Sequence, residues 1–431
     1  MTVPPRRRAA LGAALVASLL AAGCGGSSSA DDGTVTLDLG LFGTFGFEQA
    51  GLYDEYMRLN PDIRIEETSV ERSADYYRAL QTRLAAGSGL ADIQGIEIGF
   101  VADVVENHAD AFVDFAAEGN ADELLGHYYD WKVEPATTED GRVIGLGTDA
   151  GPEAMCFRRD LFEQAGLPTD RTELASRWST WEGYLELGRE YDASPTKPES
   201  TSFVDSPASV FSAAVYQGET AYNDESGNPI PETSPGVTAA WEDAAVAAAE
   251  GMTANLIQFG DEWNSAFANG AFATISCPAW MLGYISEQAG EEASGAWDVA
   301  PLPGGAGNWG GSWLGVTENS EHREEAIALV EWLTAPEQQI KMFTEEAHFP
   351  SSQEAAEDPQ VSSATNEYFS GAPVGQIFAD SAAALQFTPI GPYDTQIQEA
   401  FTNALSTVAD GTSPDDAFQA ALAEIEQVTG G

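Results

Sequence analysis

The spacing of hydrophobic positions changes period several times along the first hundred residues. Residues 34–39, 63–67 and 92–98 show the short alternating or apolar runs that are typical of strands. Between these runs, residues 48–59 and 76–86 place apolar side chains at helical spacing, and Asn60-Pro61 and Gly87 end the two helices. The order predicts a βαβαβ unit and a mostly parallel sheet with helices on both faces, where ligands bind beyond the carboxyl ends of the strands.

Helical patterns dominate the middle of the chain, and strands return after it. We expect helices over residues 159–165, 178–190, 207–216, 241–251, 262–269, 322–333, 395–408 and 414–428, and strands over residues 272–277 and 297–301. The polar stretch 222–236, which contains three Pro, predicts a surface loop. A length of 431 residues with 43% hydrophobic content favours two domains, and the alternation of elements makes both of the α/β class.

The first thirty residues have the pattern of a targeting segment. Arg6 to Arg8 precede an apolar run that ends at Ala22, shorter than the roughly 20 residues of a membrane-spanning helix, which predicts a signal peptide over residues 1–23. The residues before Cys24 resemble a bacterial lipobox, although Ala21 stands where Leu is usual. This resemblance implies lipidation of Cys24 and a lipid-anchored flexible spacer over residues 24–32; an ordinary secretory peptide is the alternative.

Net charge excludes one class of partner. The chain has 18 Lys and Arg against 69 Asp and Glu, a formal net charge of -51, which repels phosphate backbones. We therefore expect no nucleic-acid partner. Ten Trp, thirteen Tyr and twenty Phe supply too much apolar area for a disordered chain, so the sequence should fold.

Catalytic motifs are weakly represented. Residues 305–310 satisfy G-x-G-x-x-G, but a strand pattern follows instead of the helix that would hold a pyrophosphate. The four His have no metal-ligand spacing, so we expect no metal site, no cofactor and no catalytic residue. The sequence therefore predicts that the protein is not an enzyme. An exported glycoside-acting enzyme stays open as the alternative, because the distance between two carboxylates is not visible in a sequence.

Two cysteines remain after Cys24 is assigned to lipid. Cys156 and Cys277 both lie in apolar runs with strand character. In an exported protein a disulfide between them would persist, and it would close a long loop. A bridge and a pair of buried free thiols are both compatible with the sequence.

Aromatic residues stand in several loops where the core does not require them. Phe42 and Phe45 flank a Gly in the turn after the first strand, Trp280 follows a strand, and Trp309 lies just before Gly310-Gly311. A pyranose stacks its C–H face on such rings, and its hydroxyls donate to carboxylates such as those of Glu97 and Asp149. The pattern predicts a saccharide site, with core packing as the alternative role of each ring.

A series of short motifs carries a resemblance that covers nearly the whole chain after Cys24. The order of the motifs is similar to that of family 1 extracellular solute-binding proteins of ABC importers, with a maltose-binding-protein-like layout, and is closest to the sugar-binding lipoproteins of actinobacteria. The motifs are Asn60-Pro61-Asp62-Ile63, Asp92-Ile93, residues 140–146, residues 156–162 running into 165–168, residues 270–280, residues 301–304, residues 310–314, Trp332-Leu333-Thr334 and Phe349-Pro350-Ser351.

This resemblance implies a fold and a function. The fold is a two-lobed α/β periplasmic-binding-protein-like fold of type II, with hinge-connected lobes and a central cleft. Lobe one would comprise residues 33–147 and 312–346, and lobe two residues 150–308 and 350–431. The function would be to capture a di- or oligosaccharide and deliver it to ABC transporter permease subunits; a non-sugar solute is the alternative. The protein would be an exported monomer, held as a lipoprotein on the outer face of the cytoplasmic membrane by its lipid anchor only.

The resemblance also implies ligand-contacting residues, among which Trp280 would be the stacking Trp of the second lobe and Gly311 would lie at a hinge crossing. The expected ligand-binding residues are Phe42, Phe45, Glu97, Asp149, Trp263, Trp280, Trp309, Gly311, Trp313, Phe349 and Tyr393.

Overall fold

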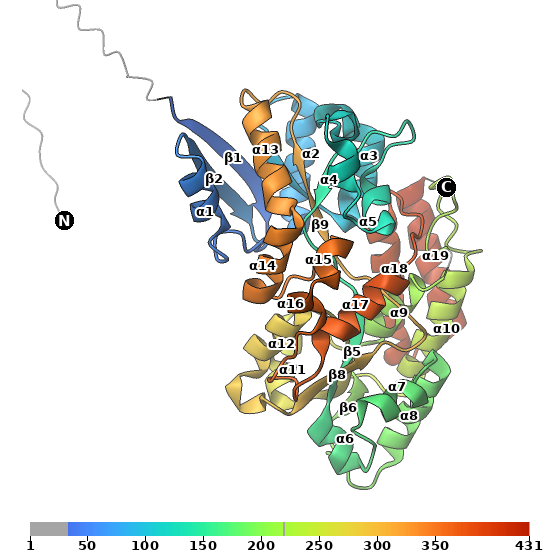
Figure 1. The fold of residues 1–431 in the computed structure, drawn as a ribbon. Coiled ribbons are helices and arrows are strands. Elements are labelled where there is room, and N and C mark those ends of the chain that lie inside the picture. Colours follow the sequence, from blue (N-terminus) through green and yellow to red (C-terminus); the bar gives the residue numbers. More distant parts are fainter. Residues whose placement is uncertain (1–32, 219, 431) are drawn as a thin grey trace, which may run out of the picture. The chain divides into compact units, whose positions relative to one another are not determined.

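The structure is a computed structural model that describes residues 33–218 and 220–430. The expected signal peptide, the spacer and Cys24 lie outside these residues. The described residues from Val35 onward form one unit that contains two β-sheets with helices packed on them (Figure 1). A search of the described helices finds none that is long and apolar enough to cross a bilayer.

The first sheet contains the predicted βαβαβ unit. Its five strands have the order β2-β1-β3-β9-β4, and β1 pairs in parallel with both β2 and β3. The strands are β1 (Val35–Phe42), β2 (Ile63–Val70), β3 (Ile93–Glu97), β4 (Leu146–Gly147) and β9 (Ser312–Val316). Strand β9 enters antiparallel between β3 and β4, so the prediction of a mostly parallel sheet holds only for the first three strands.

Alternation along β1 creates the core of this sheet. Leu37, Leu39 and Leu41 point to one side and are buried together, while Asp38 on the other side is exposed. Gly40 allows a close approach there: a Cβ at this position would lie 2.8 Å from Oε1 of Gln94. The helices of this part are α1 (Leu52–Leu59), α2 (Ser73–Ala86), α3 (Ile98–His108), α4 (Ala121–Leu125), α5 (Asp130–Val133), α13 (Arg323–Thr334) and α14 (Pro336–Glu346).

The second sheet is mainly antiparallel. Its order is β6-β7-β5-β8, and the central strand β5 runs antiparallel to both neighbours, whereas β6 and β7 are parallel. The strands are β5 (Glu153–Arg158), β6 (Ser202–Val204), β7 (Phe272–Pro278) and β8 (Trp297–Pro301). Every residue of β7 is buried, because helices cover both of its faces.

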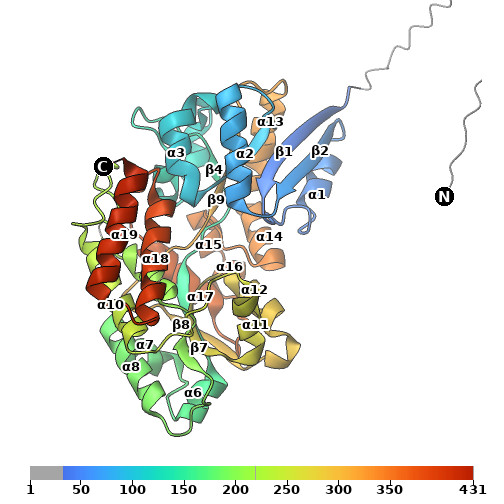
Figure 2. The same cartoon turned by 180° about the vertical axis from the view of Figure 1, so that it is seen from behind.

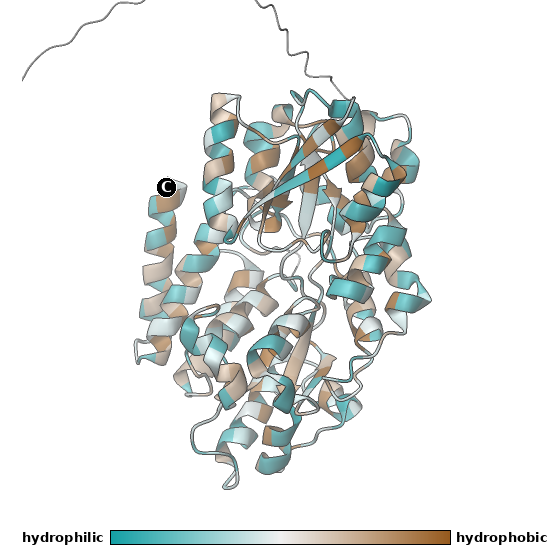
Figure 3. Ribbon diagram, turned by 90° about the vertical axis from the view of Figure 1, so that its left-hand side faces the viewer, coloured by the Kyte–Doolittle hydropathy of each residue, from teal (hydrophilic) through white to brown (hydrophobic). Residues whose placement is uncertain are grey.

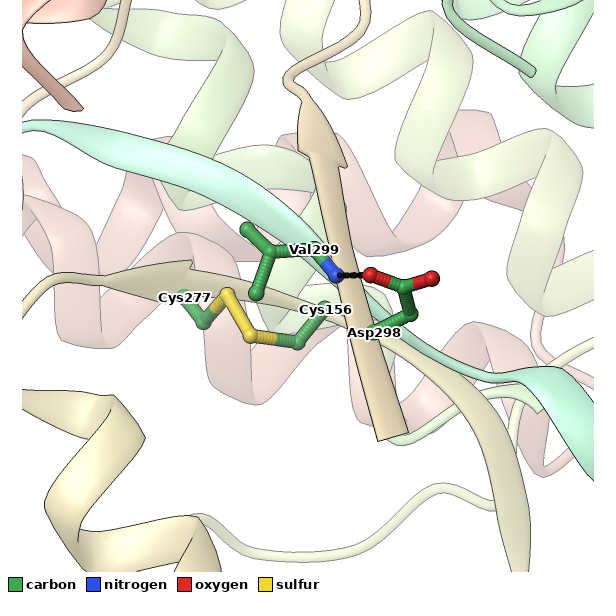
Figure 4. Close-up of a disulfide and its surroundings, with 4 residues drawn as sticks. All are labelled: Cys156, Cys277, Asp298 and Val299. Atoms are coloured by element: carbon green, nitrogen blue, oxygen red, sulfur yellow. Dashed lines mark hydrogen bonds between the residues drawn. A yellow bond between two sulfur atoms is a disulfide. The ribbon is translucent and has the colours of Figure 1, made fainter. Parts of the chain in front are cut away.

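Cys156 and Cys277 form a disulfide between β5 and β7, with their Cα atoms 5.8 Å apart and a sequence separation of 121 (Figure 4). The two residues are diagonal neighbours, because Cys156 pairs with Ile275 and Cys277 pairs with Ala154. Of the two alternatives that the sequence leaves open, the structure therefore has the bridge.

Helices surround the second sheet and include two at the end of the chain that lie side by side in both views (Figures 1 and 2). They are α6 (Arg159–Ala165), α7 (Arg171–Arg177), α8 (Trp181–Ala193), α9 (Pro207–Val215), α10 (Pro235–Ala249), α11 (Asp261–Asn269), α12 (Met281–Ala289), α15 (Gln353–Glu357), α16 (Pro359–Ser362), α17 (Val374–Ala384), α18 (Asp394–Ala409) and α19 (Pro414–Thr429). Many of these helices carry hydrophilic and hydrophobic residues on different faces, as covering helices require (Figure 3).

Two helix starts differ from the prediction for local reasons. Helix α8 begins at Trp181 and not at Trp178, because the side chain of Thr180 caps it by accepting from the N–H of Gly183. Helix α10 begins at Pro235, inside the predicted loop. Its cap is Ser234, whose hydroxyl accepts from the N–H of Val237.

Three crossings, near residues 147–151, 309–312 and 348–351, connect the part of the chain around the first sheet with the part around the second. Their backbones bond to one another. The N–H of Ala150 donates to the carbonyl of Phe349 at 2.8 Å, and the N–H of Trp309 donates to the carbonyl of Gly151 at 2.8 Å. A Cβ on Gly151 would lie 1.9 Å from the carbonyl oxygen of Trp309, so no other residue fits there. These crossings place the ends of both sheets beside one cavity.

Candidate ligand-binding cleft

A cavity of about 600 Å³ lies where the crossings meet the ends of both sheets. This volume is within the range of small-molecule sites. We call it the aromatic chamber; it is lined by Phe42, Gly43, Thr44, Phe45, Phe47, Glu71, Ser73, Glu97, Thr148, Asp149, Phe259, Trp280, Tyr284, Trp309, Gly310, Gly311, Ser312, Met342 and His348. Strands of the first sheet, loops and a helix beside the second sheet, and all three crossings therefore contribute residues to it.

One wall is a cluster of rings from loops beside the second sheet and from one crossing. Trp280 follows β7, and its indole N–H donates to the carbonyl of Trp309 at 3.1 Å. The ring centroids of Trp280 and Trp309 are 5.6 Å apart with an interplanar angle of 72°. Phe259 lies nearly parallel to Trp280, at 22° and 6.5 Å, and is 51% exposed. These rings offer a saccharide several flat apolar faces.

Phe259 belongs to this wall, although sequence reasoning missed it. Its φ is 61°, a left-handed conformation that is rare for a bulky residue. The loop before α11 holds the ring over Trp263 and Tyr284, at centroid distances of 5.0 Å and 5.8 Å. The Phe259-Gly260 pair just before a helix was the available signal, since an aromatic residue in such a loop need not serve the core.

The opposite wall comes from the turn after β1. Phe42 meets Phe45 edge to face at 5.1 Å, and Phe45 contacts Phe47 at 5.8 Å. Gly46 has a φ of 82°, which lets the chain fold back and brings the three rings together. Phe42 is half-buried, whereas Phe45 and Phe47 are buried behind it.

Two carboxylates are held in place on the floor of the chamber. Glu97 caps α3, and its Oε2 accepts from the N–H of Gly99 at 2.9 Å. Oδ1 of Asp149 accepts from the hydroxyl of Thr148 at 2.8 Å and from the N–H of Ser312 at 2.9 Å. Burial raises the pKa of Glu97 to about 7; the N–H of Gly99 opposes this shift and the charge of Asp149 adds to it.

A buried lysine lies behind these carboxylates. Lys132 of α5 is 2% exposed, and its Nζ lies over the ring of Trp313, 3.4 Å from the centroid. Burial lowers the pKa of Lys132 to about 7, although the charges of Asp149 and Glu97 act in the other direction. A Cβ on Gly311 would lie 3.0 Å from this Nζ, so the crossing passes directly over the ammonium group.

A second chamber of about 340 Å³ continues from the first and shares Ser73, Glu97, Trp309 and Gly310 with it. The other lining residues are Ala74, Ile98, Gly99, Phe100, Trp131, Pro135, Ser212, Tyr216, Asn308, Leu385, Gln386, Phe387, Thr388, Ile390, Asp394, Thr395, Gln398 and Glu399. The sequence did not predict this chamber, because its walls come from six segments, 73–74, 97–100, 131–135, 212–216, 308–310 and 385–399, that meet only in the fold.

Asp394 fixes the wall of the second chamber. Its Oδ1 accepts from Nδ2 of Asn223 at 2.6 Å and from the N–H of Gly391 at 3.1 Å, while Oδ2 is buried with no partner among the described residues. Burial raises the pKa of Asp394 to about 7, and the two donors oppose this shift. The carboxyl group thus ties the loop before α18 to the loop that holds Asn223.

Seven of the expected ligand-binding residues line the aromatic chamber: Phe42, Phe45, Glu97, Asp149, Trp280, Trp309 and Gly311. The position of Tyr393 differs: it is half-buried and lines a separate surface cavity beside Phe387 and Ile390.

Three other expected residues are buried in the core and line neither chamber. Trp263 is fully buried, and its indole N–H donates to Asp205 at 2.8 Å. Trp313 is covered by Lys132, and its N–H donates to the carbonyl of that residue at 3.0 Å. Phe349 is fully buried against Phe343 and Phe378.

The residues described in the structure contain no group of three His, Cys, Asp or Glu side chains that could hold a metal ion. The chambers present rings, hydroxyls, amides and carboxylates instead. Such a surface binds a ligand that has apolar faces and many hydroxyl groups.

Two α/β halves connected by three crossings, with a polar and aromatic cleft at the crossings, define the class of two-domain ligand-binding proteins. The chain belongs to the bacterial extracellular solute-binding protein family, whose family model matches residues 51–368. This result confirms the fold class and the family resemblance that the sequence motifs indicate.

Individual proteins agree with this assignment. The lactose-binding protein of Rhizobium radiobacter is 26% identical over 379 residues, which cover 85% of this chain and 86% of that protein. The crystal structure of an extracellular solute-binding protein of family 1 superposes with a TM-score of 0.84 at 40% identity, over 92% of this chain and 100% of that one. The ABC transporter associated binding protein of B. animalis subsp. lactis Bl-04, solved with β-1,6-galactobiose, gives a TM-score of 0.72 at 19% identity, over 92% and 97% of the two chains.

Proposed function

We propose that the protein captures a di- or oligosaccharide in the two chambers and delivers it to the permease subunits of an ABC transporter. The observation that carries this proposal is the meeting of Trp280 and Phe259 with Glu97 and Asp149 in one cavity. The rings suit the apolar face of a pyranose, and the carboxylates accept hydrogen bonds from its hydroxyl groups. A lactose-binding relative and a structural neighbour that holds a galactobiose support a saccharide ligand.

The proposed mechanism is capture by closure. A sugar that touches the rings of both walls gains more contacts when the walls approach, so it favours the closed arrangement that a permease would recognise. We assign residues 33–147 and 312–346 to lobe one and residues 150–308 and 350–431 to lobe two. The hinges are the crossings near residues 147–151, 309–312 and 348–351, which bond to one another through their backbones.

The proposal also covers where the protein acts. The N-terminal sequence supports export, cleavage before Cys24 and lipid attachment at that residue. Residues 24–32 would then serve as a lipid-anchored spacer, and the protein would act as a monomer on the outer face of the cytoplasmic membrane. Mass spectrometry of the mature N-terminus tests the anchor, since an unmodified cysteine would contradict it.

A glycoside-acting enzyme is the second candidate, and one observation favours it. Glu97 has a raised pKa, and its neighbour Asp149 is a second carboxylate on the same chamber floor. Glycosidases use such a pair as acid and nucleophile or base. In this chain both carboxylates already accept backbone N–H groups, which suits fixed hydrogen-bond acceptors.

A thermal-shift screen of residues 33–431 against mono- and oligosaccharides separates the candidates. A ligand at 100 times its Kd adds about 2.7 kcal/mol of stability, so a saccharide that binds raises the Tm visibly. We expect such a shift with no release of reducing ends on prolonged incubation. Cleavage of the saccharide would establish the enzyme, and a panel without any shift would contradict sugar capture.

A further inference from the structure

The charged groups of the two chambers have one sign. Glu71, Glu97 and Asp149 line the aromatic chamber, and Glu97, Asp394 and Glu399 line the second. Within the described residues, neither lining contains Lys or Arg, and His348 is the one basic side chain. A ligand that spans both chambers therefore meets carboxylates along its whole length.

The nearest buried cation cannot reach this ligand. Lys132 is 2% exposed, lies beneath Gly311 and covers the ring of Trp313. Its charge acts on Glu97 and Asp149 from behind, so it balances two carboxylates without presenting a donor to the cavity. Lys341, next to the lining residue Met342, is paired with Glu55 at 3.0 Å.

The surroundings already resist further negative charge. Burial raises the pKa of Glu97 and of Asp394 to about 7, because a desolvated carboxylate is costly in each place. A carboxylate or phosphate on the ligand would be desolvated beside them without a cationic partner. The formal net charge of -51 adds long-range repulsion during approach.

We propose that the cleft selects its saccharide by charge: it accepts neutral or amine-bearing units and rejects saccharides that carry a uronate or phosphate group. This inference depends on the proposed sugar-binding function and narrows its substrate class. Charge-assisted hydrogen bonds, such as those from the fork of an Arg, are the strong partners of an anionic group, and neither lining offers an Arg or a Lys in the part of the chain that the structure describes.

The test uses a matched set of ligands. A neutral oligosaccharide that stabilises the protein is compared by calorimetry with its counterparts in which one hydroxymethyl group is oxidised to a carboxylate or one hydroxyl is replaced by an amine. We expect the uronate to bind at least about tenfold more weakly than the neutral sugar, and the amine to bind no more weakly. The difference in affinity between the uronate and the neutral sugar should decrease as ionic strength increases, because salt screens the repulsion.

Two variants test whether the carboxylates that line the chambers cause the weaker binding of the uronate. Glu399→Gln and Glu71→Gln each remove one exposed carboxylate from a chamber, and Glu424→Gln removes an exposed one from α19 as the matched control. The ratio of uronate affinity to neutral affinity should rise severalfold in the first two and stay at the wild-type value in the control.

The outcomes separate the two proposals. Equal binding of the uronate and the neutral sugar, or a ratio that neither lining variant changes, would overturn charge selection while leaving sugar capture in place. Failure of every neutral sugar to bind would instead contradict the proposed function itself.

Discussion

The ammonium group of Lys132 lies 3.4 Å from the centroid of the Trp313 ring, and the indole N–H of Trp313 donates to the carbonyl of the same lysine. The two residues are therefore joined by a cation–π contact and by a hydrogen bond. A Cβ on Gly147 would lie 2.8 Å from Cε of Lys132, so the aliphatic part of the side chain fills the space beneath a crossing. This pairing places Trp313 in the core and the lysine charge behind the cleft.

We expect Lys132→Ala to lower the free energy of unfolding by about 2–4 kcal/mol, because it leaves a cavity beneath the crossings. Lys132→Met keeps a chain of similar length and should lose less. Urea denaturation of both variants measures the difference. If the two variants lose the same stability, the aliphatic packing of Lys132 does not contribute as we describe.

Trp280→Ala should weaken saccharide binding by about 1–3 kcal/mol, the scale for a buried stacking ring. Isothermal titration calorimetry with a sugar found in the thermal screen measures it. Trp280→Phe is the companion variant: it keeps a ring but loses the 3.1 Å hydrogen bond to Trp309, so it should bind with intermediate affinity. If Trp280→Ala binds the sugar with wild-type affinity, Trp280 does not contact the ligand.

Phe259 should respond to substitution in an unusual order. Its φ of 61° is strained for any residue with a Cβ, so Phe259→Gly should be more stable than Phe259→Ala by about 0.5–1 kcal/mol. Both variants should bind sugar less tightly than the wild type, since they lack the ring beside Trp280. Chemical denaturation measures the stability of the two variants. If Phe259→Ala is the more stable one, the loop has moved out of the left-handed conformation and the prediction is wrong.

Gly151→Ala should destabilise the protein by more than about 3 kcal/mol, because its Cβ would lie 1.9 Å from the backbone oxygen of Trp309. The matched control is Gly283→Ala in α12, where nothing lies within 4 Å of the new Cβ and Ala favours the helix. Thermal denaturation should show a large loss for the first variant and none for the second. Equal Tm values for the two variants would mean that the backbone near Trp309 moves away from the new Cβ at little cost in stability.

The buried carboxyl of Glu153 predicts a pH dependence of stability. Both of its oxygens are buried without a partner among the described residues, and burial raises its pKa from 4.5 to about 8. Between these two values the folded state holds the proton more tightly than the unfolded chain, so this group's contribution to stability falls as pH rises from about 5 to 8.

Glu153→Gln removes that titration. The free energy of unfolding of this variant minus that of the wild type should increase by on the order of 1–3 kcal/mol from pH 5 to pH 8. Urea denaturation at both pH values measures this difference. A difference between variant and wild type that stays constant over this range would show that Glu153 does not titrate there.

The sequence predicts the local parts of the fold well, because hydrophobic period and helix signals act within a few residues. The βαβαβ unit follows from alternation in β1 to β3. The antiparallel entry of β9 between β3 and β4 does not, since a strand's partner is chosen by packing of segments far apart in sequence.

In the candidate site, too, the sequence predicts some residues and misses others. Glu97 ends β3 and Trp280 follows β7, at strand ends where ligand residues collect, and both line the aromatic chamber as the sequence predicts. Trp313 stands only two residues beyond Gly311, but strand alternation turns its ring onto Lys132 and away from the chamber. Phe259 escapes prediction because its exposure depends on a left-handed backbone conformation that the sequence does not reveal.

The disulfide between β5 and β7 leaves the folded chain without a reactive thiol at Cys156 or Cys277. The sequence holds three cysteines, and a product trimmed to residues 33–431 lacks Cys24. A cysteine introduced at exposed Thr44, on the rim of the aromatic chamber, would then be the single site for a fluorescent label. The protein is therefore already suited to become an optical sensor for whatever it carries.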